Sequence, residues 1–298
     1  MPRVVIFGPG ALGCLFAGRF ALAGIDAWLL DYDPYRAAQL QSQGIIIEEE
    51  HARKVALPKV SVLPPTAPDL ILVLTKSYST VQLCLPLNAP VLTLQNGLGN
   101  AEILAARCGS HRVLAGATSE AATLLTPGRV RHAARGTTTF GAWDGCNTQT
   151  AVTLFQQAGF EAVLTDNPRK ALWWKAVISA TVNPLTALLN VPNGGLLDTS
   201  ETRSMLRGLV NEAVRAAHAE GIQFEESMVE MVENICLTTR TNISSMLQDI
   251  RNGKPTEIEA ISGEILRRAG TAGLRLPKTE VVYRLVSAME ALHTCYNP

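Results

Sequence analysis

A glycine pattern near the start of the chain limits what the first half can fold into. The pattern is G-x-G-x-x-G, and its members are Gly8, Pro9, Gly10, Ala11, Leu12 and Gly13. It follows the apolar run Val4–Phe7 and opens a helix-spaced stretch. In such a strand–turn–helix, the glycines allow a tight turn, close approach of a pyrophosphate to the backbone, and close packing of helix on strand. The pattern predicts a dinucleotide-binding turn, with an ordinary glycine-rich turn as the alternative.

The first half of the chain alternates short apolar runs with helical stretches. We expect strands and helices in turn at Arg3–Phe7, Ala11–Ala23, Ala27–Leu30, Pro34–Ser42, Asp69–Leu74 and Val91–Leu94. Such alternation is typical of a parallel sheet with helices on both faces. From residue 113 to residue 141 Thr, Val and Gly become frequent, which predicts several further strands.

The second half is dominated by apolar residues at helical spacing. The expected helices are Pro168–Asn190, Glu201–Glu220, Ser227–Thr239, Ile243–Arg251 and Thr256–Thr271. A chain of 298 residues is long enough for two domains of about 100–200 residues each. The sequence therefore predicts an α/β fold, with a Rossmann-type N-terminal domain over residues 1–166 and a mostly α-helical C-terminal domain over residues 167–298.

Charge and cysteine content narrow the class of protein. Lys plus Arg and Asp plus Glu both number 26, which gives no electrostatic attraction to nucleic acid or to an acidic membrane surface. The six cysteines form no C-x-x-C pair, which argues against a zinc site or a disulfide framework. No apolar run approaches the ~20 residues that span a bilayer, and none has the form of a secretory leader. We expect a cytoplasmic protein without nucleic-acid, membrane or metal partners.

Asp31 stands at the end of the second expected strand. An acid about 20 residues beyond the glycine pattern can accept hydrogen bonds from the adenosine ribose hydroxyls, and it repels a 2′-phosphate. Asp31 therefore favours NADH over NADPH as the cofactor. The alternative is that Asp31 or Asp33 only caps the helix expected to begin near Pro34.

Two further polar segments follow expected strands. Lys76 comes after Asp69–Leu74, and Asn96, followed by a glycine, comes after Val91–Leu94. Open α/β sheets bind ligands at the carboxyl ends of their strands, so both residues are candidates for contact with a ligand. The alternatives are a solvated lysine and a plain Asn-Gly turn.

Lys175, Ser179 and Asn183 are spaced i, i+4 and i+8, which places them on one face of the expected helix. Asn183 precedes Pro184, and a proline at this position is predicted to kink or interrupt the helix. Polar groups beside a helix break commonly line a site. A solvated polar stripe is the alternative.

A second polar face is expected farther along the chain. Asn242, Ser245 and Asp249 share one face of the helix expected over Ile243–Arg251 and the residue before it. Glu257 falls in the first turn of the following helix, where an acid also interacts favourably with the helix dipole.

Several short strings span nearly the whole chain: Gly8–Gly13, Leu74–Lys76, Gln95–Gly99, Trp174–Lys175, Asn183–Ala187, Pro192–Gly194, Asn242–Arg251 and Thr256–Ile258. In this order they resemble the 2-dehydropantoate 2-reductase (ketopantoate reductase) family. The string NISSMLQDIR is the most specific of them. The resemblance implies a nicotinamide-dependent reduction of ketopantoate to pantoate, a step in pantothenate and coenzyme A biosynthesis.

The resemblance also implies roles for individual residues. Lys175 is expected to donate the proton to the keto oxygen of the substrate, and Glu257 to help position Lys175. Lys76, Asn96, Ala122 and Glu257 are expected along the cofactor. The residues expected to hold the substrate are Lys175, Ser179, Asn183, Asn193, Asn242, Ser245, Met246, Leu247 and Gln248. A free lysine, with a pKa of ~10.4, is a reluctant donor, so a partly desolvated lysine is expected.

Two positions depart from the family pattern. Ser179 stands where the family usually has a substrate-binding Asn, and residues 31–32 lack the Arg that many relatives carry for the phosphate of NADPH. NADPH is the family default, whereas Asp31 favours NADH. Two other functions stay open: a related hydroxy-acid dehydrogenase acting on another small 2-oxo acid, and a nicotinamide-sensing regulator that has lost the chemistry. A homodimer is also left open.

Overall fold

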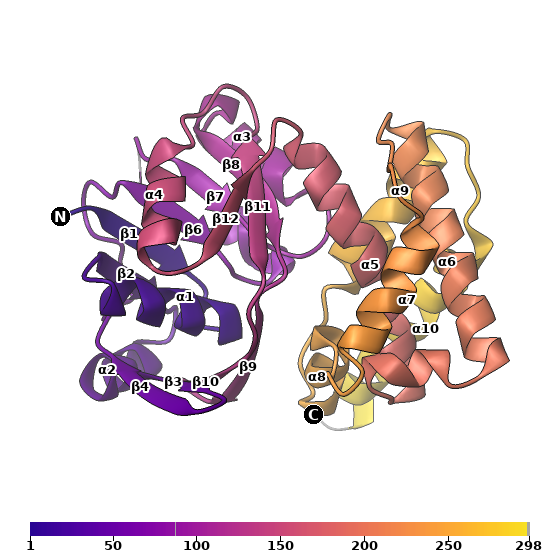
Figure 1. The fold of residues 1–298 in the computed structure, drawn as a ribbon, viewed down its shortest axis with the longest axis horizontal. Coiled ribbons are helices and arrows are strands. Elements are labelled where there is room, and N and C mark those ends of the chain that lie inside the picture. Colours follow the sequence, from indigo (N-terminus) through magenta and orange to yellow (C-terminus); the bar gives the residue numbers. More distant parts are fainter. Residues whose placement is uncertain (87, 297–298) are drawn as a thin grey trace. The chain divides into compact units, whose positions relative to one another are not determined.

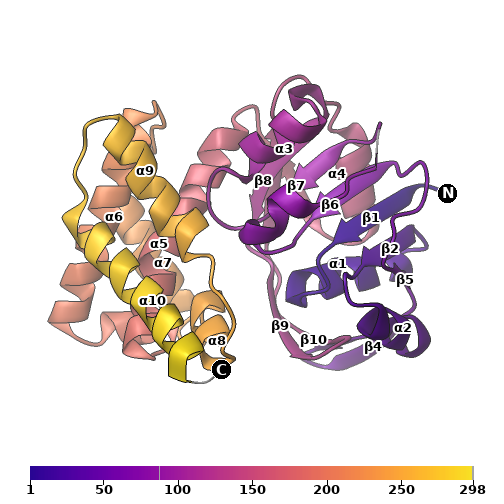
Figure 2. The same cartoon turned by 180° about the vertical axis from the view of Figure 1, so that it is seen from behind.

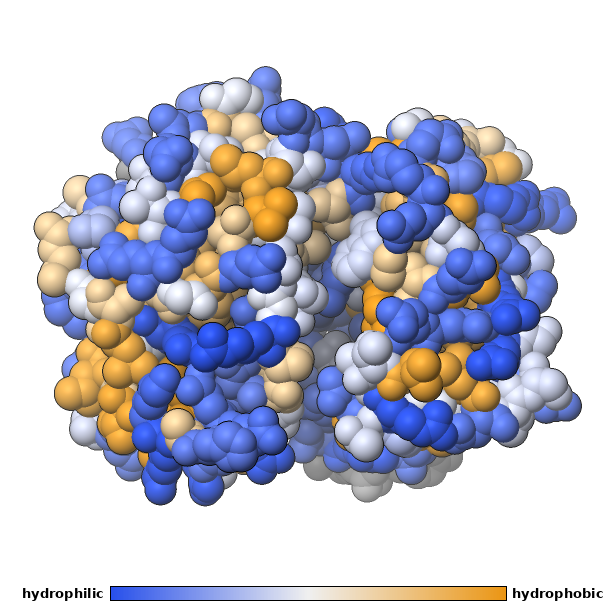
Figure 3. Space-filling model, in the orientation of Figure 1, coloured by the Kyte–Doolittle hydropathy of each residue, from blue (hydrophilic) through white to orange (hydrophobic). Residues whose placement is uncertain are grey.

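The computed structural model describes residues 1–86 and 88–296. The chain forms two compact units, which Figures 1 and 2 show as ribbons. The N-terminal unit holds residues 1–95 and 100–171, and the helical unit holds residues 96–99 and the chain from residue 172 onward. The face drawn in Figure 3 is largely hydrophilic, with scattered hydrophobic patches. Within the described residues, every helix is too short or too polar to cross a membrane.

An eight-stranded sheet forms the centre of the N-terminal unit, in the order β12-β11-β8-β7-β6-β1-β2-β5. The strands from β8 to β5 in this order are parallel, β11 is antiparallel to β8, and β12 is parallel to β11. The bounds are β1 (Arg3–Phe7), β2 (Asp26–Leu30), β5 (Lys59–Ser61), β6 (Leu70–Val73), β7 (Val91–Thr93), β8 (Val113–Thr118), β11 (Thr137–Ala142) and β12 (Glu161–Leu164). The strand order reverses at β1, between β2 and β6, and open α/β sheets bind ligands at such a reversal.

Helices cover both faces of this sheet. Figures 1 and 2 show α1 and α4 on one face and α3 on the other. The helical elements are α1 (Ala11–Leu22), α2 (Pro34–Gln43), α3 (Asn100–Cys108), α4 (Gln149–Gln157) and the 3-10 turns η1 (Ser77–Gln82) and η2 (Ser110–Arg112). The α/β, Rossmann-type fold predicted for the first half of the chain is confirmed.

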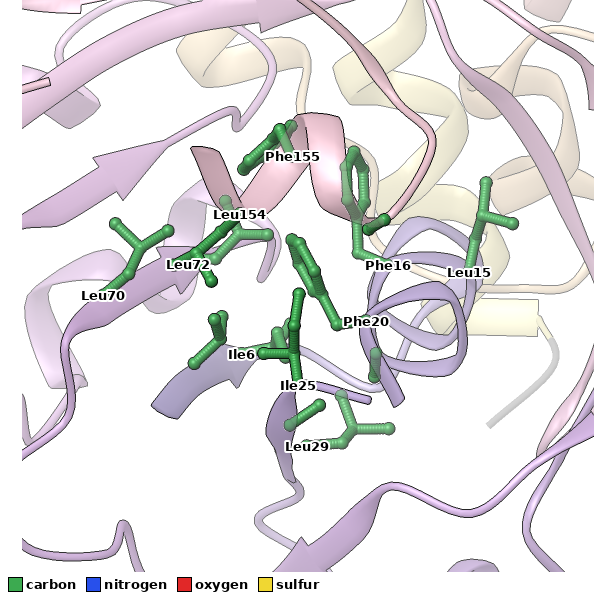
Figure 4. Packing of buried hydrophobic residues seen from close by; sticks show 14 of the residues in the cluster. Ile6, Leu15, Phe16, Phe20, Ile25, Leu29, Leu70, Leu72, Leu154 and Phe155 are labelled. Atoms are coloured by element: carbon green, nitrogen blue, oxygen red, sulfur yellow. The ribbon is translucent and has the colours of Figure 1, made fainter. Parts of the chain in front are cut away.

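Aromatic rings fill the space between the sheet, α1 and α4, as Figure 4 shows. The ring centroids of Phe16 and Phe155 lie 5.4 Å apart, and those of Phe16 and Phe160 lie 4.4 Å apart. Phe16, Phe20 and Phe155 are fully buried. Helix α1 is therefore apolar on almost every side, because it lies inside the unit.

A second, four-stranded sheet has the order β4-β3-β10-β9. Its strands are β3 (Ile45–Glu49), β4 (Ala52–Ala56), β9 (Ala121–Thr126) and β10 (Arg129–Ala134). Strands β8 to β11 are the further strands expected between residues 113 and 141. The hairpin of β3 and β4 was not predicted from the sequence.

The helical unit is built from α-helices and short turns. These are α5 (Pro168–Leu189, which begins in the N-terminal unit), η3 (Asn193–Leu197), α6 (Ser200–Ala219), α7 (Met228–Thr238), α8 (Ser245–Arg251), the π-helical turn η4 (Glu259–Gly263), α9 (Glu264–Thr271) and α10 (Pro277–Tyr296). Side-chain oxygens of Thr199, Ser227 and Ser244 cap the N-termini of α6, α7 and α8. The buried Glu212 accepts hydrogen bonds from the first amides of α10, those of Lys278 and Thr279.

Two local expectations for this half were wrong, in whole or in part. Pro184 does not interrupt α5, because the neighbouring Val182 and Leu185 are almost fully buried and hold the turn in place, whereas the alternative of a kink stays a prediction. Asn242 does not lie on a helix with Ser245. Helix α8 begins only at Ser245, because the Ser244 hydroxyl accepts the Leu247 amide and fixes the helix start there.

All six cysteines are free. Burial raises the pKa of the Cys14 thiol to about 12 and that of Cys236 to about 11. Cys84, in the N-terminal unit, and Cys295, in the helical unit, are exposed.

Replacing Phe16 by Ala should destabilise the N-terminal unit severely. The ring is fully buried, so the variant loses its apolar contacts and leaves a cavity, at a cost of about 3–5 kcal/mol in unfolding free energy. Leu22 lies on the same helix with 45% of its surface exposed, and Leu22→Ala should change stability by less than about 1 kcal/mol. Urea denaturation of the two variants measures both values. Equal losses would mean that the rings around Phe16 rearrange to fill the space.

Candidate active site

The glycine turn after β1 has the strand–turn–helix context that the sequence predicts. Gly8 has a φ of +111°, and a Cβ there would lie 2.7 Å from the backbone nitrogen of Thr75, after β6. A Cβ on Gly13 would lie 1.7 Å from the carbonyl oxygen of Gly8. Both positions therefore require glycine because backbone approaches backbone. At Gly10, by contrast, a Cβ would have no atom within 4 Å apart from those of the adjoining chain, so the space beside this residue is open.

The start of α1 offers unpaired donors beside this open space. Gly10 is the N-cap, and no side chain caps the helix. The first amides of a helix lack intrahelical partners and carry partial positive charge. Open space at Gly10 and an uncapped helix N-terminus together fit the pyrophosphate of a dinucleotide.

Asp31 is buried at the end of β2 and holds Arg36. The Arg36 Nε and Nη2 atoms each donate to an Asp31 carboxylate oxygen at 2.5 Å, and the guanidinium carbon lies 5.0 Å from the centre of the Tyr32 ring. The pairing raises the pKa of Arg36 above its ordinary value. Asp33, and not Asp31, caps α2, since it accepts the amides of Tyr35 and Arg36. The negative charge of Asp31 is thus neutralised by an arginine in the first turn of α2.

A buried polar network fixes the loops after β6 and β7. The Gln95 amide nitrogen donates to the Thr75 carbonyl at 2.9 Å and to the Thr80 hydroxyl at 2.8 Å. The Asn100 side chain accepts from Thr80 and donates to Ser77. Lys76 lies in sequence between Thr75 and Ser77, which both take part in this network. Sequence reasoning missed this network, although amides at strand ends are a usable signal for it.

Asn96 and Glu257 come together in the helical unit. The Asn96 Nδ2 atom donates to Glu257 Oε2 at 3.3 Å, and Glu257 is only 6% exposed. Lys175 forms no ion pair with Glu257 or with any other carboxylate among the residues that the structure describes. The expected positioning of Lys175 by Glu257 stays a prediction.

Lys175, Ser179 and Asn183 share one face of α5. Ser179 is 3% exposed, and Lys175 and Asn183 are partly buried, so this face is not a solvated stripe. Burial lowers the pKa of the Lys175 ammonium, because desolvation disfavours the charged form. An ammonium with a lowered pKa, not paired with a carboxylate, is the kind of group that releases a proton readily.

Asn193 is held by the segment between α7 and α8. Its amide nitrogen donates to the Thr239 hydroxyl at 2.9 Å, and its backbone amide donates to the Asn242 carbonyl at 3.0 Å. The Asn193 Oδ1 atom is buried and has no hydrogen-bond partner among the described residues. A buried acceptor without a donor costs free energy, so this oxygen is suited to a donor group from a ligand or a water.

The segment Ser245–Gln248 divides into exposed and buried side chains. Ser245 is exposed, whereas Met246 and Leu247 are each 1% exposed and belong to the hydrophobic interior. The Gln248 side chain donates to the Ile243 carbonyl at 2.8 Å. Of these four residues, only Ser245 has an exposed polar side chain that forms no hydrogen bond within the described part of the chain.

Helices α5 and α8 are linked by residues that sequence reasoning missed. The Thr186 hydroxyl donates to Ser244 Oγ at 2.7 Å, and Ser244 is the N-cap of α8. Thr239, the partner of Asn193, was also missed. A serine just before a helix is a usable signal for a cap, but nothing local marks its contact with Thr186.

The remaining candidate, Ala122, lies on β9 opposite His132 of β10 and is partly buried. It belongs to the four-stranded sheet of the N-terminal unit. Within the described part of the chain, no cluster of three or more His, Cys, Asp or Glu side chains has the arrangement of a metal site.

The strand order of the large sheet reverses at a glycine turn, and the helical unit carries a lysine with a lowered pKa. Together these features define the class of two-unit, dinucleotide-dependent oxidoreductases. Family models described as ketopantoate reductase PanE/ApbA and ketopantoate reductase PanE/ApbA C terminal match residues 4–145 and 167–290. A 2-dehydropantoate 2-reductase of Halobacterium salinarum is 35% identical over 95% of this chain and 97% of its own. The chain belongs to the ketopantoate reductase family.

Solved structures agree with this assignment. A PanE/ApbA family ketopantoate reductase from Ralstonia eutropha is 28% identical, with a TM-score of 0.90 over 98% of this chain and 99% of its own. A D-mandelate dehydrogenase in complex with NADH is 26% identical, with a TM-score of 0.86 over 97% of this chain and 99% of its own. The family is NAD(P)H-dependent.

The link between Thr186 and Ser244 should matter for the substrate as well as for stability. Ser244→Ala and Thr199→Ala each remove an N-cap, and each should cost about 1 kcal/mol of unfolding free energy. Only Ser244 also contacts α5, so only Ser244→Ala should raise KM for the oxo acid, by about tenfold. Urea denaturation and steady-state kinetics measure the two effects. An equal change of KM in both variants would contradict a special role for this link.

Proposed function

We propose that this protein is a 2-dehydropantoate 2-reductase, which reduces ketopantoate to pantoate in the cytoplasm with hydride from NADH or NADPH. In this proposal residues 1–166 bind the dinucleotide, and residues 167–298 bind the substrate and supply the proton. The observation that carries it is the face of α5 on which Lys175, with its lowered pKa, stands beside Ser179 and Asn183. Family membership supports the same reaction.

The chemistry follows from what reduction of a ketone requires. The nicotinamide, when bound, supplies a hydride to the carbonyl carbon of the substrate. Negative charge then develops on the carbonyl oxygen, and the Lys175 ammonium stabilises it and donates a proton to it. The lysine leaves this step neutral and regains its proton from solvent. Partial burial serves the step because it makes the charged lysine a stronger acid.

The other polar groups of the helical unit suit the two ends of ketopantoate. The hydroxyl of Ser245 and the amides of Asn183 and Asn242 offer donors for the carboxylate. The unpartnered Asn193 Oδ1 is an acceptor, and the terminal hydroxyl of ketopantoate is a donor. An aryl 2-oxo acid such as phenylglyoxylate has no hydroxyl to fill that position, so it leaves the acceptor unsatisfied.

The second candidate function is a hydroxy-acid dehydrogenase for another 2-oxo acid. It is favoured by Ser179, which replaces the Asn usual in the family and leaves more room on α5, and by the likeness to D-mandelate dehydrogenase. The buried acceptor on Asn193 favours ketopantoate instead. The two candidates differ in which oxo acid gives the higher kcat/KM.

Turnover of ketopantoate and phenylglyoxylate by the wild type and two Lys175 variants tests the proposal. Lys175→Ala should lower kcat for ketopantoate by about 10²–10⁴-fold while the cofactor Kd is unchanged, because the lysine acts on the substrate carbonyl. In the wild type, kcat should fall as the pH rises through the lowered pKa of Lys175. Lys175→Arg should lose that decline, because a guanidinium keeps its proton. Higher kcat/KM with phenylglyoxylate would favour the second function, and near-normal kcat in Lys175→Ala would remove the lysine from the mechanism.

For the cofactor, we propose that NADH is used at least as well as NADPH. A buried Asp31 is a suitable acceptor for ribose hydroxyls, and two of the Arg36 nitrogens that could bind a 2′-phosphate are engaged by Asp31. Because Arg36 neutralises Asp31, the pair does not exclude NADPH outright.

Replacing Arg36 by Ala and replacing Asp31 by Ala should shift the cofactor preference in opposite directions. Arg36→Ala leaves Asp31 uncompensated, so it should lower kcat/KM for NADPH by about tenfold relative to NADH. Asp31→Ala releases Arg36 and should shift the same ratio toward NADPH by a similar factor. Steady-state kinetics with both cofactors give the ratios. A strong NADPH preference that neither variant alters would show that other residues read the 2′-phosphate.

A further inference from the structure

The segment Asn96–Gly99 follows strand β7 of the N-terminal unit but is part of the helical unit. Its Leu98 amide donates to the Ala260 carbonyl at 2.9 Å. The Leu98 side chain is buried, and the Asn96 side chain donates to Glu257. These two hydrogen bonds of the segment therefore involve the turn η4 or a residue shortly before it.

The π-helical geometry of η4 explains why the Ala260 carbonyl is open to another donor. In a regular α-helix the Ala260 carbonyl would accept the amide of residue 264. Here the Glu264 amide donates instead to the carbonyls of Glu259 and Ile261. The Leu98 amide therefore takes the place of the helical donor at Ala260. Such π-turns occur often at functional sites, and this one closely follows Glu257.

Gly97 makes the approach of the segment to η4 sterically feasible. Its φ is +81°, and a Cβ there would lie 2.4 Å from the Ala260 oxygen and 2.6 Å from its carbonyl carbon. These are backbone atoms, so no side-chain rotation could relieve the clash. Any residue larger than glycine at position 97 must push the segment away from η4.

We propose that Gly97 is a positioning residue for the reduction. By letting the Leu98 amide complete the hydrogen bonding of η4, Gly97 fixes Asn96 against Glu257. The roles of Asn96 and Glu257 in binding cofactor rest on the proposed function, whereas the docking of the segment on η4 does not. Gly97 itself touches neither substrate nor cofactor in this proposal and acts through its two neighbours.

The matched pair Gly97→Ala and Gly99→Ala tests the proposal. Gly99 has a similar φ of +87°, but a Cβ there would lie no closer than 3.7 Å to any atom, so its variant has the backbone strain without the clash. Gly97→Ala should raise hydrogen–deuterium exchange of the 96–99 segment and lower kcat/KM by about 10²-fold, the usual effect of displacing a site by about 1 Å. Gly99→Ala should keep exchange of the segment slow and keep turnover within about threefold of the wild type. Both measurements are made below the melting temperature of Gly97→Ala, which should be the lower of the two because only this variant loses the contact of the segment with η4.

Two results would overturn the positioning role. One is an equal loss of kcat/KM in both variants, which would trace the effect to backbone strain alone. The other is fast exchange of the segment in Gly97→Ala with normal turnover. The exchange measurement uses the protein without substrate, so a wild type that fails to reduce ketopantoate refutes the proposed function and leaves the docking of the segment to be judged by exchange alone.

Discussion

The N-terminal unit depends on one close approach, between the start of α1 and the peptide of Gly8. A Cβ on Gly13 would overlap the Gly8 carbonyl oxygen, so the helix can lie this near to the strand only without a side chain there. Once it lies there, Phe16 and Phe20 reach the rings of α4 and close the hydrophobic core. The same approach holds the uncapped end of α1 beside the open space at Gly10. Core packing and the geometry of the proposed phosphate-binding turn therefore both result from this one contact.

In the helical unit, the candidate groups are held by hydrogen bonds between elements that lie far apart in sequence. Thr186 on α5 contacts the cap of α8, Thr239 holds the Asn193 amide, and Leu98 completes the turn η4. Each of these bonds orients a group without being a candidate for contact with the substrate. On α5, burial lowers the pKa of the Lys175 ammonium, which forms no ion pair with a carboxylate among the described residues.

Local signals predicted most of the fold, and long-range contacts explain what was missed. The glycine turn was predictable because its context, an apolar run before and helical spacing after, lies within a few residues. The hairpin β3–β4 was missed because Glu50 and His51 at its turn are not turn-forming residues such as Asn-Gly. The face shared by Lys175, Ser179 and Asn183 followed from helical spacing alone. The pairing of Asp31 with Arg36 was not predicted, because spacing in the sequence cannot tell whether two side chains of opposite charge meet or point apart.

The cysteines differ in exposure and in thiol pKa, so two of them are suited to labelling with dyes. Cys14 and Cys236 are buried, with thiol pKa values of about 12 and about 11, so they hold almost no thiolate at neutral pH and resist alkylation. Cys84 and Cys295 are exposed, and one belongs to each unit. A maleimide dye pair should therefore attach to these two thiols in the unaltered chain, with the half-buried Cys108, whose pKa is also raised, reacting more slowly. Energy transfer between the dyes would then follow the separation of the two units in solution as cofactor and substrate are added.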